Sequence, residues 1–516
     1  MKKHIQNALT LSGLLITPAL FAQQRPNVVI ILADDMGYGD IQCNNPYART
    51  LTPAIDQLAA EGIRFTEAHS AGALSGPSRY GLVTGRYFFR EEVHDDYYGY
   101  LQPFIQPDRL TIGEMMKQAG YHTACIGKWH LGMNWETKDK TQPQILDRQT
   151  LGYTNTDFSK PVTGGPASCG FDYSFILPAS LDMPPYVFVK NSKVIDSDVI
   201  LTADAYPNTR PDTEFDWDRK YTTGSDIYWE RGMWWRNGEM SRSFKFEDCL
   251  PTIVEEGISF IDRAGKKKKP FFLYMPLTGP HTPWLPTEEA EGKTEMGCYG
   301  DFICDIDDCI RRVDRKLEEL GIKDNTIVIF ASDNGSAWDE KDVMKYGHQS
   351  NWSRRGMKGD AWDGGHHVPL IVRWPEQIKQ AGQTSCTVSL ADLFATLADI
   401  TGETLPAGQA EDSFSFKSIL EGKLDTEIRE DIIYFSGSHK LAIKRGKWKY
   451  IECLGSAGFS YPVQVKPEQD GPQGQLYNME TDSMETTNLI LQEPEIAKEL
   501  AEALKRYVEQ GHSRPM

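Results

Sequence analysis

The chain has 516 residues, with 55 Lys and Arg against 73 Asp and Glu, and a formal net charge of −18. This length is enough for a large core and more than one domain. The acidic balance excludes a sequence-independent nucleic-acid binder, which needs a basic face, so we expect no nucleic-acid partner. An anionic ligand would have to be attracted by a local cluster of cations.

The N-terminus predicts a secretory signal peptide over residues 1–22. Lys2 and Lys3 give it a charged start, residues 8–20 form a short apolar run, and Ala22 is a small residue before the expected cleavage. The run is short for a membrane span, and no later run is long enough. An uncleaved anchor is the alternative. We therefore expect an exported, periplasmic protein with no membrane span after the signal is removed.

Apolar runs alternate with helical patterns over residues 23–425. The runs are typical of strands buried on both faces and lie at 27–33, 122–126, 270–275, 326–331 and 369–374. Helical patterns lie at 53–61, 111–118 and 299–320. This alternation predicts an α/β catalytic domain with a mostly parallel central sheet flanked by helices.

Two further segments differ from this pattern. Residues 139–242 are rich in Asp, Asn, Pro, Tyr and Trp and predict long loops, which either shape substrate choice near a site or merely cover the sheet edge. Short strands expected at 431–435, 440–443 and 447–451 precede a helical pattern at 493–510. Residues 426–516 are therefore predicted to form a smaller α+β subdomain with an antiparallel sheet.

The segment Ser75-Gly76-Pro77-Ser78-Arg79 has the composition of a helix start. Proline is favoured in the first helical turn, because its missing N–H would have no partner there. Ser75 is therefore expected at a helix N-terminus, where free N–H groups and the helix dipole attract an oxyanion. Arg79 adds a cation one turn later. The segment predicts a place to attack a phosphate or sulfate ester.

Two pairs of oxygen-bearing side chains follow buried strands. Asp34 and Asp35 follow the run at 27–33, and Asp333 and Asn334 follow the run at 326–331. Each pair alone would be interpreted as a helix cap or turn. Ligands of open α/β sheets bind outside the carboxyl ends of the strands, so two such pairs favour a metal site. The oxygen set suits Ca²⁺ or Mg²⁺, and its amide ligand favours calcium.

Cations and histidines are found near the same strand ends. Lys128 and His130 follow the run at 122–126, His281 follows 270–275, and Lys358 precedes a glycine. The lysines could hold ester oxygens, and the imidazoles could exchange protons near neutral pH. A single lysine is more often solvated, and a single histidine is more often structural, so the argument rests on their joint occurrence.

Together these motifs resemble the formylglycine-dependent sulfatases (type I, arylsulfatase-like) of the alkaline-phosphatase superfamily, in a bacterial serine-type form specific for carbohydrates. The resemblance covers nearly the whole mature chain and implies an alkaline-phosphatase-like fold. It is carried by residues 34–40, Ser75-x-Pro77-Ser78-Arg79 with residues 84–86, residues 127–132, residues 280–283, residues 333–335, and Lys358 with Gly364-Gly365.

The resemblance implies that a serine-type maturase oxidises Ser75 to formylglycine (3-oxoalanine). The hydrated aldehyde has two hydroxyls: one attacks sulfur and expels the sugar alcohol, and the other expels sulfate. One Ca²⁺ ion would be bound by Asp34, Asp35, residue 75, Asp333 and Asn334. Arg79 and Lys128 would hold the hydrate and sulfate, Lys358 and His281 the sulfate and leaving oxygen, with His281 as general acid and His130 as base.

The implied substrate is a sulfated carbohydrate. We expect a galactose- or N-acetylgalactosamine-type glycan such as chondroitin or mucin. One alternative is a phosphodiesterase or phosphonate hydrolase of the same superfamily, and another is a non-enzymatic glycan-binding relative in which Ser75 stays unmodified. Relatives commonly have Glu-Gly-Gly-x-Arg where this chain has residues 363–367, Asp-Gly-Gly-His-His, a difference expected to alter the pocket rim.

Overall fold

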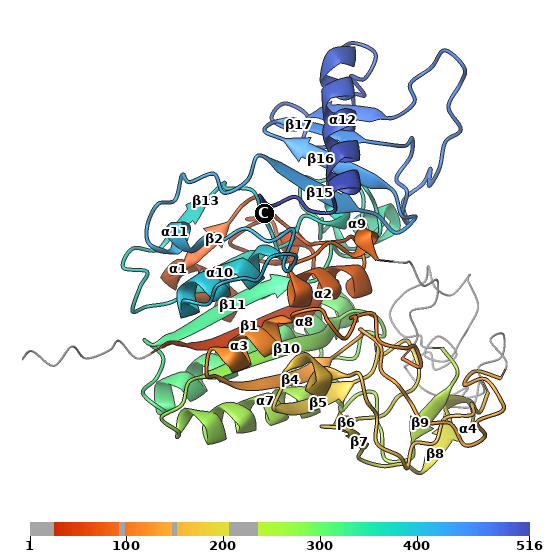
Figure 1. Cartoon of the computed structure of the whole chain (residues 1–516), viewed down its shortest axis with the longest axis vertical. Coiled ribbons are helices and arrows are strands. Elements are labelled where there is room, and N and C mark those ends of the chain that lie inside the picture. The colour runs from red at the N-terminus through yellow and green to blue at the C-terminus, as the bar shows by residue number, and fades with distance from the viewer. Residues whose placement is uncertain (1–24, 92–98, 147–151, 206–235, 516) are drawn as a thin grey trace, which may run out of the picture.

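A ten-stranded sheet forms the centre of the computed structural model (Figure 1), which describes residues 25–91, 99–146, 152–205 and 236–515. The predicted signal peptide lies outside these residues. The strand order is β13-β2-β12-β11-β1-β10-β4-β5-β6-β7. In chain order the strands are β1 (Asn27–Asp34), β2 (Ile63–Phe65), β4 (His122–Lys128), β5 (Tyr173–Leu177), β6 (Val189–Lys190), β7 (Lys193–Val194), β10 (Phe271–Pro280), β11 (Thr326–Ser332), β12 (Leu370–Arg373) and β13 (Gly382–Thr384).

The middle of the sheet is parallel, as predicted. Strands β11, β1, β10, β4 and β5 all run in one direction. Strand β12 lies where an apolar run predicted it, but it pairs antiparallel with both β11 and β2. The carboxyl ends of β11, β1, β10 and β4 therefore lie side by side at one edge of the sheet.

Strand β1 shows why the sheet is covered on both faces. Its residues alternate between two hydrophobic clusters. Val28, Ile30 and Leu32 belong to the cluster that includes residues of α2 (Ser75–Thr84), α3 (Ile112–Gln118) and α10 (Asp392–Thr401). Val29 and Ile31 pack with residues of α1 (Pro53–Glu61), α7 (Cys249–Gly265) and α8 (Gly297–Glu319). Three helices on each face exclude water, which explains the continuous apolar run of this strand.

The helices begin and end close to their predicted positions. Helix α1 spans Pro53–Glu61, with proline in its first turn. Helix α3 follows Thr111, whose side chain accepts a hydrogen bond from the Glu114 N–H while the Glu114 side chain bonds back to Thr111. This reciprocal capping satisfies two N–H groups that would otherwise be unpaired at the helix start.

The prediction of loops for residues 139–242 was only partly right. Buried strand β5 lies in this segment and extends the parallel sheet beside β4. The short pairs β6–β7 and β8 (Val199–Leu201)–β9 (Glu239–Ser241) also involve it. The rest of the described segment runs as loops and turns, and Asp182, Met183 and Arg236 reach the cavity described below.

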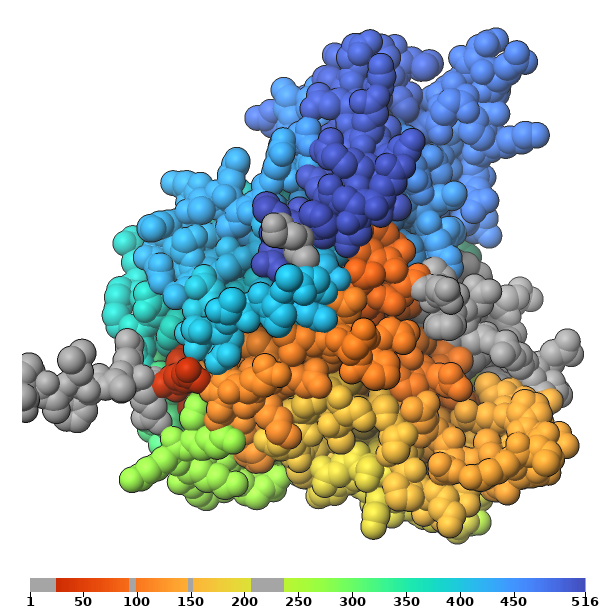
Figure 2. Space-filling view, in the orientation of Figure 1, coloured from red at the N-terminus to blue at the C-terminus, as the bar shows by residue number. Residues whose placement is uncertain are grey.

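A separate antiparallel sheet lies near the C-terminus, as predicted. Its strands are β15 (Asp431–Phe435), β16 (Leu441–Arg445), β17 (Trp448–Ile451) and β18 (Gln475–Asn478), of which β18 was not predicted. Helix α12 (Pro494–Gln510) packs on this sheet through Leu500 and Leu504, in a cluster that also contains Ala71 and Tyr87. In Figure 2 the blue C-terminal surface accordingly adjoins the orange surface of the region around α2.

The described residues include no helix that is both long and apolar enough to cross a membrane.

Candidate active site

The parallel strands bring their terminal polar residues together. Asp34 ends β1, Lys128 ends β4, His281 follows β10, and Asp333 follows β11. These strands are neighbours in the order β11-β1-β10-β4, so their ends converge. The expectation that the chemistry-bearing residues meet at the carboxyl ends of the strands is met by this geometry.

Three carboxylates form a compact group at this edge. One oxygen from each of Asp34, Asp35 and Asp333 lies within 4.8 Å of the others, and all three residues are buried. The amide nitrogen of Asn334 donates to Asp35 Oδ1 at 2.6 Å and to the Gly335 carbonyl at 2.9 Å. The amide oxygen of Asn334 is thereby turned toward Ser75. A donor set made only of carboxylate and amide oxygens fits a hard divalent cation such as calcium.

Helix α2 presents Ser75 to this group. The helix begins at Ser75, as predicted. The Ser75 hydroxyl lies 3.1 Å from Asp34 Oδ1 and 3.5 Å from Asn334 Oδ1, and it accepts a hydrogen bond from Lys128 Nζ at 3.2 Å. One turn later, Arg79 donates through two nitrogens to Asp333 Oδ2, at 3.1 and 2.7 Å. Asp34, Lys128 and Asn334 contact Ser75 from the ends of β1, β4 and β11, and Arg79 braces the site from α2 itself.

Each carboxylate is paired with a different cation. Arg79 binds Asp333, Lys128 Nζ lies 2.7 Å from Asp34 Oδ2, and Lys358 Nζ lies 2.8 Å from Asp35. Three negative and three positive side chains leave this group formally neutral. A bound divalent cation would make it doubly positive, which is the charge that complements a sulfate group.

The charges also set the protonation states of the site. Burial raises the pKa of Asp34, but Lys128, His281 and Arg79 outweigh this effect and leave the pKa below its usual value. Burial lowers the pKa of Lys128, and Asp34 opposes that effect only in part. Asp34 is therefore ionised near neutral pH.

Two histidines flank the group, and both line a cavity of about 180 Å³. His281 Nδ1 lies 2.7 Å from the Thr282 carbonyl, which can only accept, so this nitrogen carries a proton. The other nitrogen, Nε2, lies 3.6 Å from Asp35 Oδ2 and faces the carboxylates. His130, with its backbone at a positive φ of 55°, is the second histidine. The cavity is also lined by Ser75, Lys358, Asp182 and Arg236.

Sequence reasoning missed two charged residues of this cavity, Asp182 and Arg236. Arg236 Nη1 donates to Asp182 Oδ2 at 2.9 Å. Burial raises the pKa of Asp182, but His281, Arg236 and Lys358 hold it below its usual range. Both residues come from the segment predicted as loops, and neither belongs to a recognisable motif. The only signal in the sequence was the expectation that this segment lies near a site.

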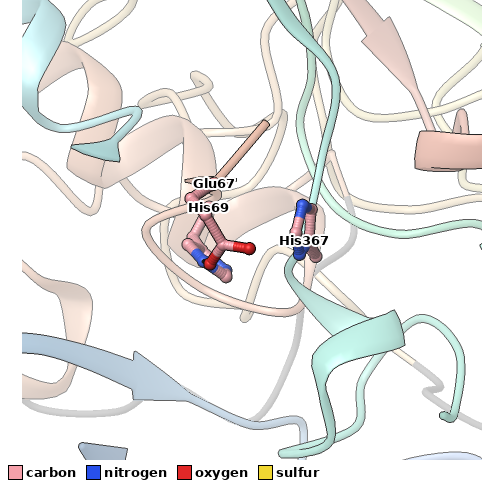
Figure 3. Close-up of side chains that lie close together, drawn as sticks. All are labelled: Glu67, His69 and His367. Carbon is pink, nitrogen blue, oxygen red and sulfur yellow. The ribbon is translucent and has the colours of Figure 1, made fainter. Parts of the chain in front are cut away.

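A second cluster of potential metal ligands is found away from this cavity: Glu67, His69 and His367 (Figure 3), with potential ligand atoms within 4.8 Å of one another. The potential ligand atoms of Glu67 and His367 already have partners. Arg354 donates to Glu67 Oε1 at 3.3 Å and to His367 Nδ1 at 3.0 Å, and Lys444 donates to Glu67 Oε2 at 3.0 Å. Two adjacent cations disfavour a third, so the cluster is an ion-paired hydrogen-bond network.

The variant segment 363–367 belongs to this network. Its expected effect on the pocket rim was wrong, because none of its residues lines the cavity. Lys449 of β17 donates to Asp363 Oδ1 at 2.9 Å, and the His366 ring stacks on Tyr434 of β15 with ring centroids 3.8 Å apart. The segment instead joins the large sheet to the C-terminal sheet.

Comparisons with known proteins agree with this geometry. The Sulfatase family model matches residues 26–403. The chain is 34% identical over 505 residues to an N-acetylgalactosamine-6-O-sulfatase of Bacteroides thetaiotaomicron, covering 93% of each chain. It is 27% identical to rat arylsulfatase G, covering 91% of this chain and 84% of the relative.

A solved structure is also similar to this chain. It was described in work on the metabolism of multiple glycosaminoglycans by B. thetaiotaomicron, and it superimposes with a TM-score of 0.78. Its sequence is 33% identical, and the match covers 94% of this chain and 100% of that one. The chain therefore belongs to the sulfatase family and is a sulfuric ester hydrolase.

Proposed function

We propose that the protein is an exported, periplasmic sulfatase that removes sulfate from a sugar of the galactose or N-acetylgalactosamine type, as in chondroitin or mucin. The observation that carries the proposal is the position of Ser75, whose hydroxyl contacts Asp34, Asn334 and Lys128 at the wall of a cavity. The preference for N-acetylgalactosamine is supported by the 34% identical relative of that name.

Two groups complete the proposed site. Asp34, Asp35, Asp333, Asn334 and residue 75 would hold one calcium ion, which supplies positive charge to sulfate oxygens and polarises residue 75 when bound. Oxidation of Ser75 to formylglycine by a serine-type maturase supplies a hydrated aldehyde, with one hydroxyl for attack on sulfur and another for release of sulfate.

The cations are assigned to binding and orientation. Lys128 Nζ lies 3.2 Å from Ser75 Oγ, so it can hold both the residue 75 side chain and a sulfate oxygen. Arg79 is fully buried and donates to the Lys128 carbonyl at 3.3 Å as well as to Asp333, so it fixes both elements on either side of Ser75. Lys358 lies on the cavity wall and is assigned to sulfate.

The histidines are assigned to proton transfer. Since His281 Nδ1 donates to the Thr282 carbonyl, Nε2 is the nitrogen that would donate a proton to the leaving sugar oxygen. His130 lines the same cavity on the β4 side and is assigned as the base that accepts a proton when sulfate leaves. This arrangement separates the acid and the base onto different strand ends.

A panel of sulfated sugars tests the substrate class. Sulfate release is measured from N-acetylgalactosamine 4- and 6-sulfates, galactose 6-sulfate and chondroitin sulfate disaccharides, with Ser75→Ala as the inactive control. A matched panel of phosphate esters is measured on the same preparation. We expect release from at least one sulfated sugar. Faster turnover of the phosphate esters would instead favour a phosphodiesterase or phosphonate hydrolase.

The mass of the peptide containing Ser75 tests the modification. Oxidation of serine to formylglycine removes two hydrogens, so protein from the native host should give a peptide lighter by about 2 Da. The same peptide from a host without a serine-type maturase serves as control. An unmodified peptide in active native protein would overturn the formylglycine proposal, and in inactive native protein it would favour the glycan-binding alternative.

A further inference from the structure

The cavity contains a carboxylate oxygen without a hydrogen-bond donor. Asp182 lies after β5, is 3% exposed and lines the cavity beside His281. Its Oδ1 atom has no hydrogen-bond partner among the described residues. His281 Nδ1 lies 3.9 Å away, but its proton is directed to the Thr282 carbonyl at 2.7 Å. A buried carboxylate oxygen costs free energy unless a donor reaches it.

The other half of the same carboxylate is held firmly. Arg236 Nη1 donates to Asp182 Oδ2 at 2.9 Å, and the Arg236 backbone N–H donates to the Asp182 carbonyl at 3.1 Å. These bonds fix the plane of the carboxylate and leave Oδ1 as its available acceptor. Arg236 also lines the cavity, so the pair forms one wall of it.

The position of Asp182 relative to His281 indicates what the donor is. The Nε2 atom of His281 faces Asp35 and the sulfate end of the site, whereas Asp182 lies on the Nδ1 side of the same ring. A substrate whose ester oxygen meets Nε2 therefore brings its neighbouring ring groups toward Asp182. Sugar hydroxyls are donors that an acceptor-only carboxylate can bind.

We propose that Asp182 Oδ1 accepts a hydrogen bond from a ring hydroxyl of the sugar close to the sulfated position, and that Asp182 is thereby a specificity-determining residue. This inference rests on the proposed function. In addition to the residues assigned to the sulfate group, Asp182 would then contact the sugar ring itself. A site built to pair with a substrate hydroxyl discriminates against analogues that lack it, since its polar group is then left unpaired.

The test measures each enzyme variant with each substrate analogue, so that the effect of removing a substrate hydroxyl can be compared between wild type and the Asp182 variants. Wild type, Asp182→Ala and Asp182→Asn are assayed with N-acetylgalactosamine 6-sulfate, its 3-deoxy and 4-deoxy analogues, and galactose 6-sulfate, which lacks the acetamido group. Asp198→Asn is the matched control, because Asp198 is an exposed, Arg-paired aspartate of the same segment that does not line the cavity.

In wild type, loss of one hydroxyl is expected to lower kcat/KM by about 10- to 150-fold, the range for a hydrogen bond to a charged group. In Asp182→Ala, loss of the same hydroxyl should lower kcat/KM only slightly, because the carboxylate that would accept its hydrogen bond is already absent. Asp198→Asn should keep the wild-type pattern.

Several outcomes would overturn the inference. Equal losses in wild type and both Asp182 variants for every deoxy analogue would show that no hydroxyl is bound there. Coupling seen only with galactose 6-sulfate would make the acetamido N–H the donor. A uniform loss for all substrates, with a shifted pH profile, would make Asp182 a positioning residue for His281.

Failure of the proposed function gives a different result. If wild type releases sulfate from none of the sugars, calorimetric titration of N-acetylgalactosamine 6-sulfate into wild type and Asp182→Ala decides the inference on binding alone. A weaker affinity in Asp182→Ala supports it, and an equal affinity or no binding by wild type overturns it.

Discussion

Acid should destabilise the protein through His69, a fully buried imidazole in the network of Figure 3. His69 Nδ1 lies 3.1 Å from His366 Nδ1, and His69 Nε2 lies 3.7 Å from Glu67 Oε2. Burial lowers the pKa of His69 to about 4, and Glu67 compensates only in part. Lys449 reaches His366 from the C-terminal sheet at 3.3 Å, so an added proton would face an existing positive charge.

The sign and size of the effect follow from proton binding. An unfolded histidine has a pKa of about 6.5, so between about pH 6.5 and pH 4 the unfolded chain binds more protons than the folded chain. Stability is therefore lost as the pH falls through this window. For a folded pKa of about 4, the loss between pH 7 and pH 5 is about 2 kcal/mol from His69 alone.

Urea unfolding of wild type and His69→Gln at pH 7 and pH 5 measures this contribution. Fluorescence and circular dichroism followed together would reveal transitions that are not two-state. The unfolding free energy of wild type should fall by about 2 kcal/mol more than that of His69→Gln, because other groups titrate in both proteins. His122→Gln, at a side chain 28% exposed, is the control. Equal losses in wild type and His69→Gln would refute the reasoning.

Other predictions concern the site and one backbone position. Lys128→Ala and His281→Ala should each lower sulfate release by at least about 100-fold with unchanged circular dichroism, since each removes charge-assisted contacts; near-normal turnover in either variant would contradict its role. On the proposed function, removal of calcium by EGTA should lower both the melting temperature and the activity, because three buried carboxylates would lose the ion that they share, and added calcium should restore both. Gly127→Ala should lower the melting temperature by several degrees, because Gly127 has a φ of 132° and a new Cβ would lie 1.8 Å from the Pro276 carbonyl oxygen. Gly120→Ala, also at positive φ but with nothing within 4 Å, should cost less, and an equal loss would contradict the steric argument.

The central strands and the site at their ends could be predicted because each has a local sequence pattern. A run such as residues 27–33 must be apolar throughout when helices cover both faces, and Asp34 follows it directly. Strand direction has no such local signature. Strand β12 is an apolar run like β11 and β1, but it pairs antiparallel with β11. Pairing partners are chosen by long-range contacts that the run itself does not encode.

The wall of the cavity formed by Asp182 and Arg236 was the least predictable part. Asp182 and Arg236 come from a segment without periodicity, and they become a pair only when loops around β5 and β9 fold together. His366 and His367 stand where relatives commonly have other residues, so they were expected at the pocket rim. Both are buried away from the cavity instead, and His366 stacks on Tyr434 of the C-terminal sheet. Local sequence gave no means to distinguish these two environments.

The burial of Ser75 bears on whether the residue is oxidised before or after the protein folds. The residue is only 4% exposed, and its hydroxyl faces Asn334, which is synthesised 259 residues later. An enzyme that oxidises this side chain needs access to it, and once α2 docks against the ends of β1 and β11 the side chain can be reached only through the cavity. On the proposed function, an oxidising enzyme that cannot enter this cavity must act while the chain is still open, and a copy that folds first stays inactive until it unfolds.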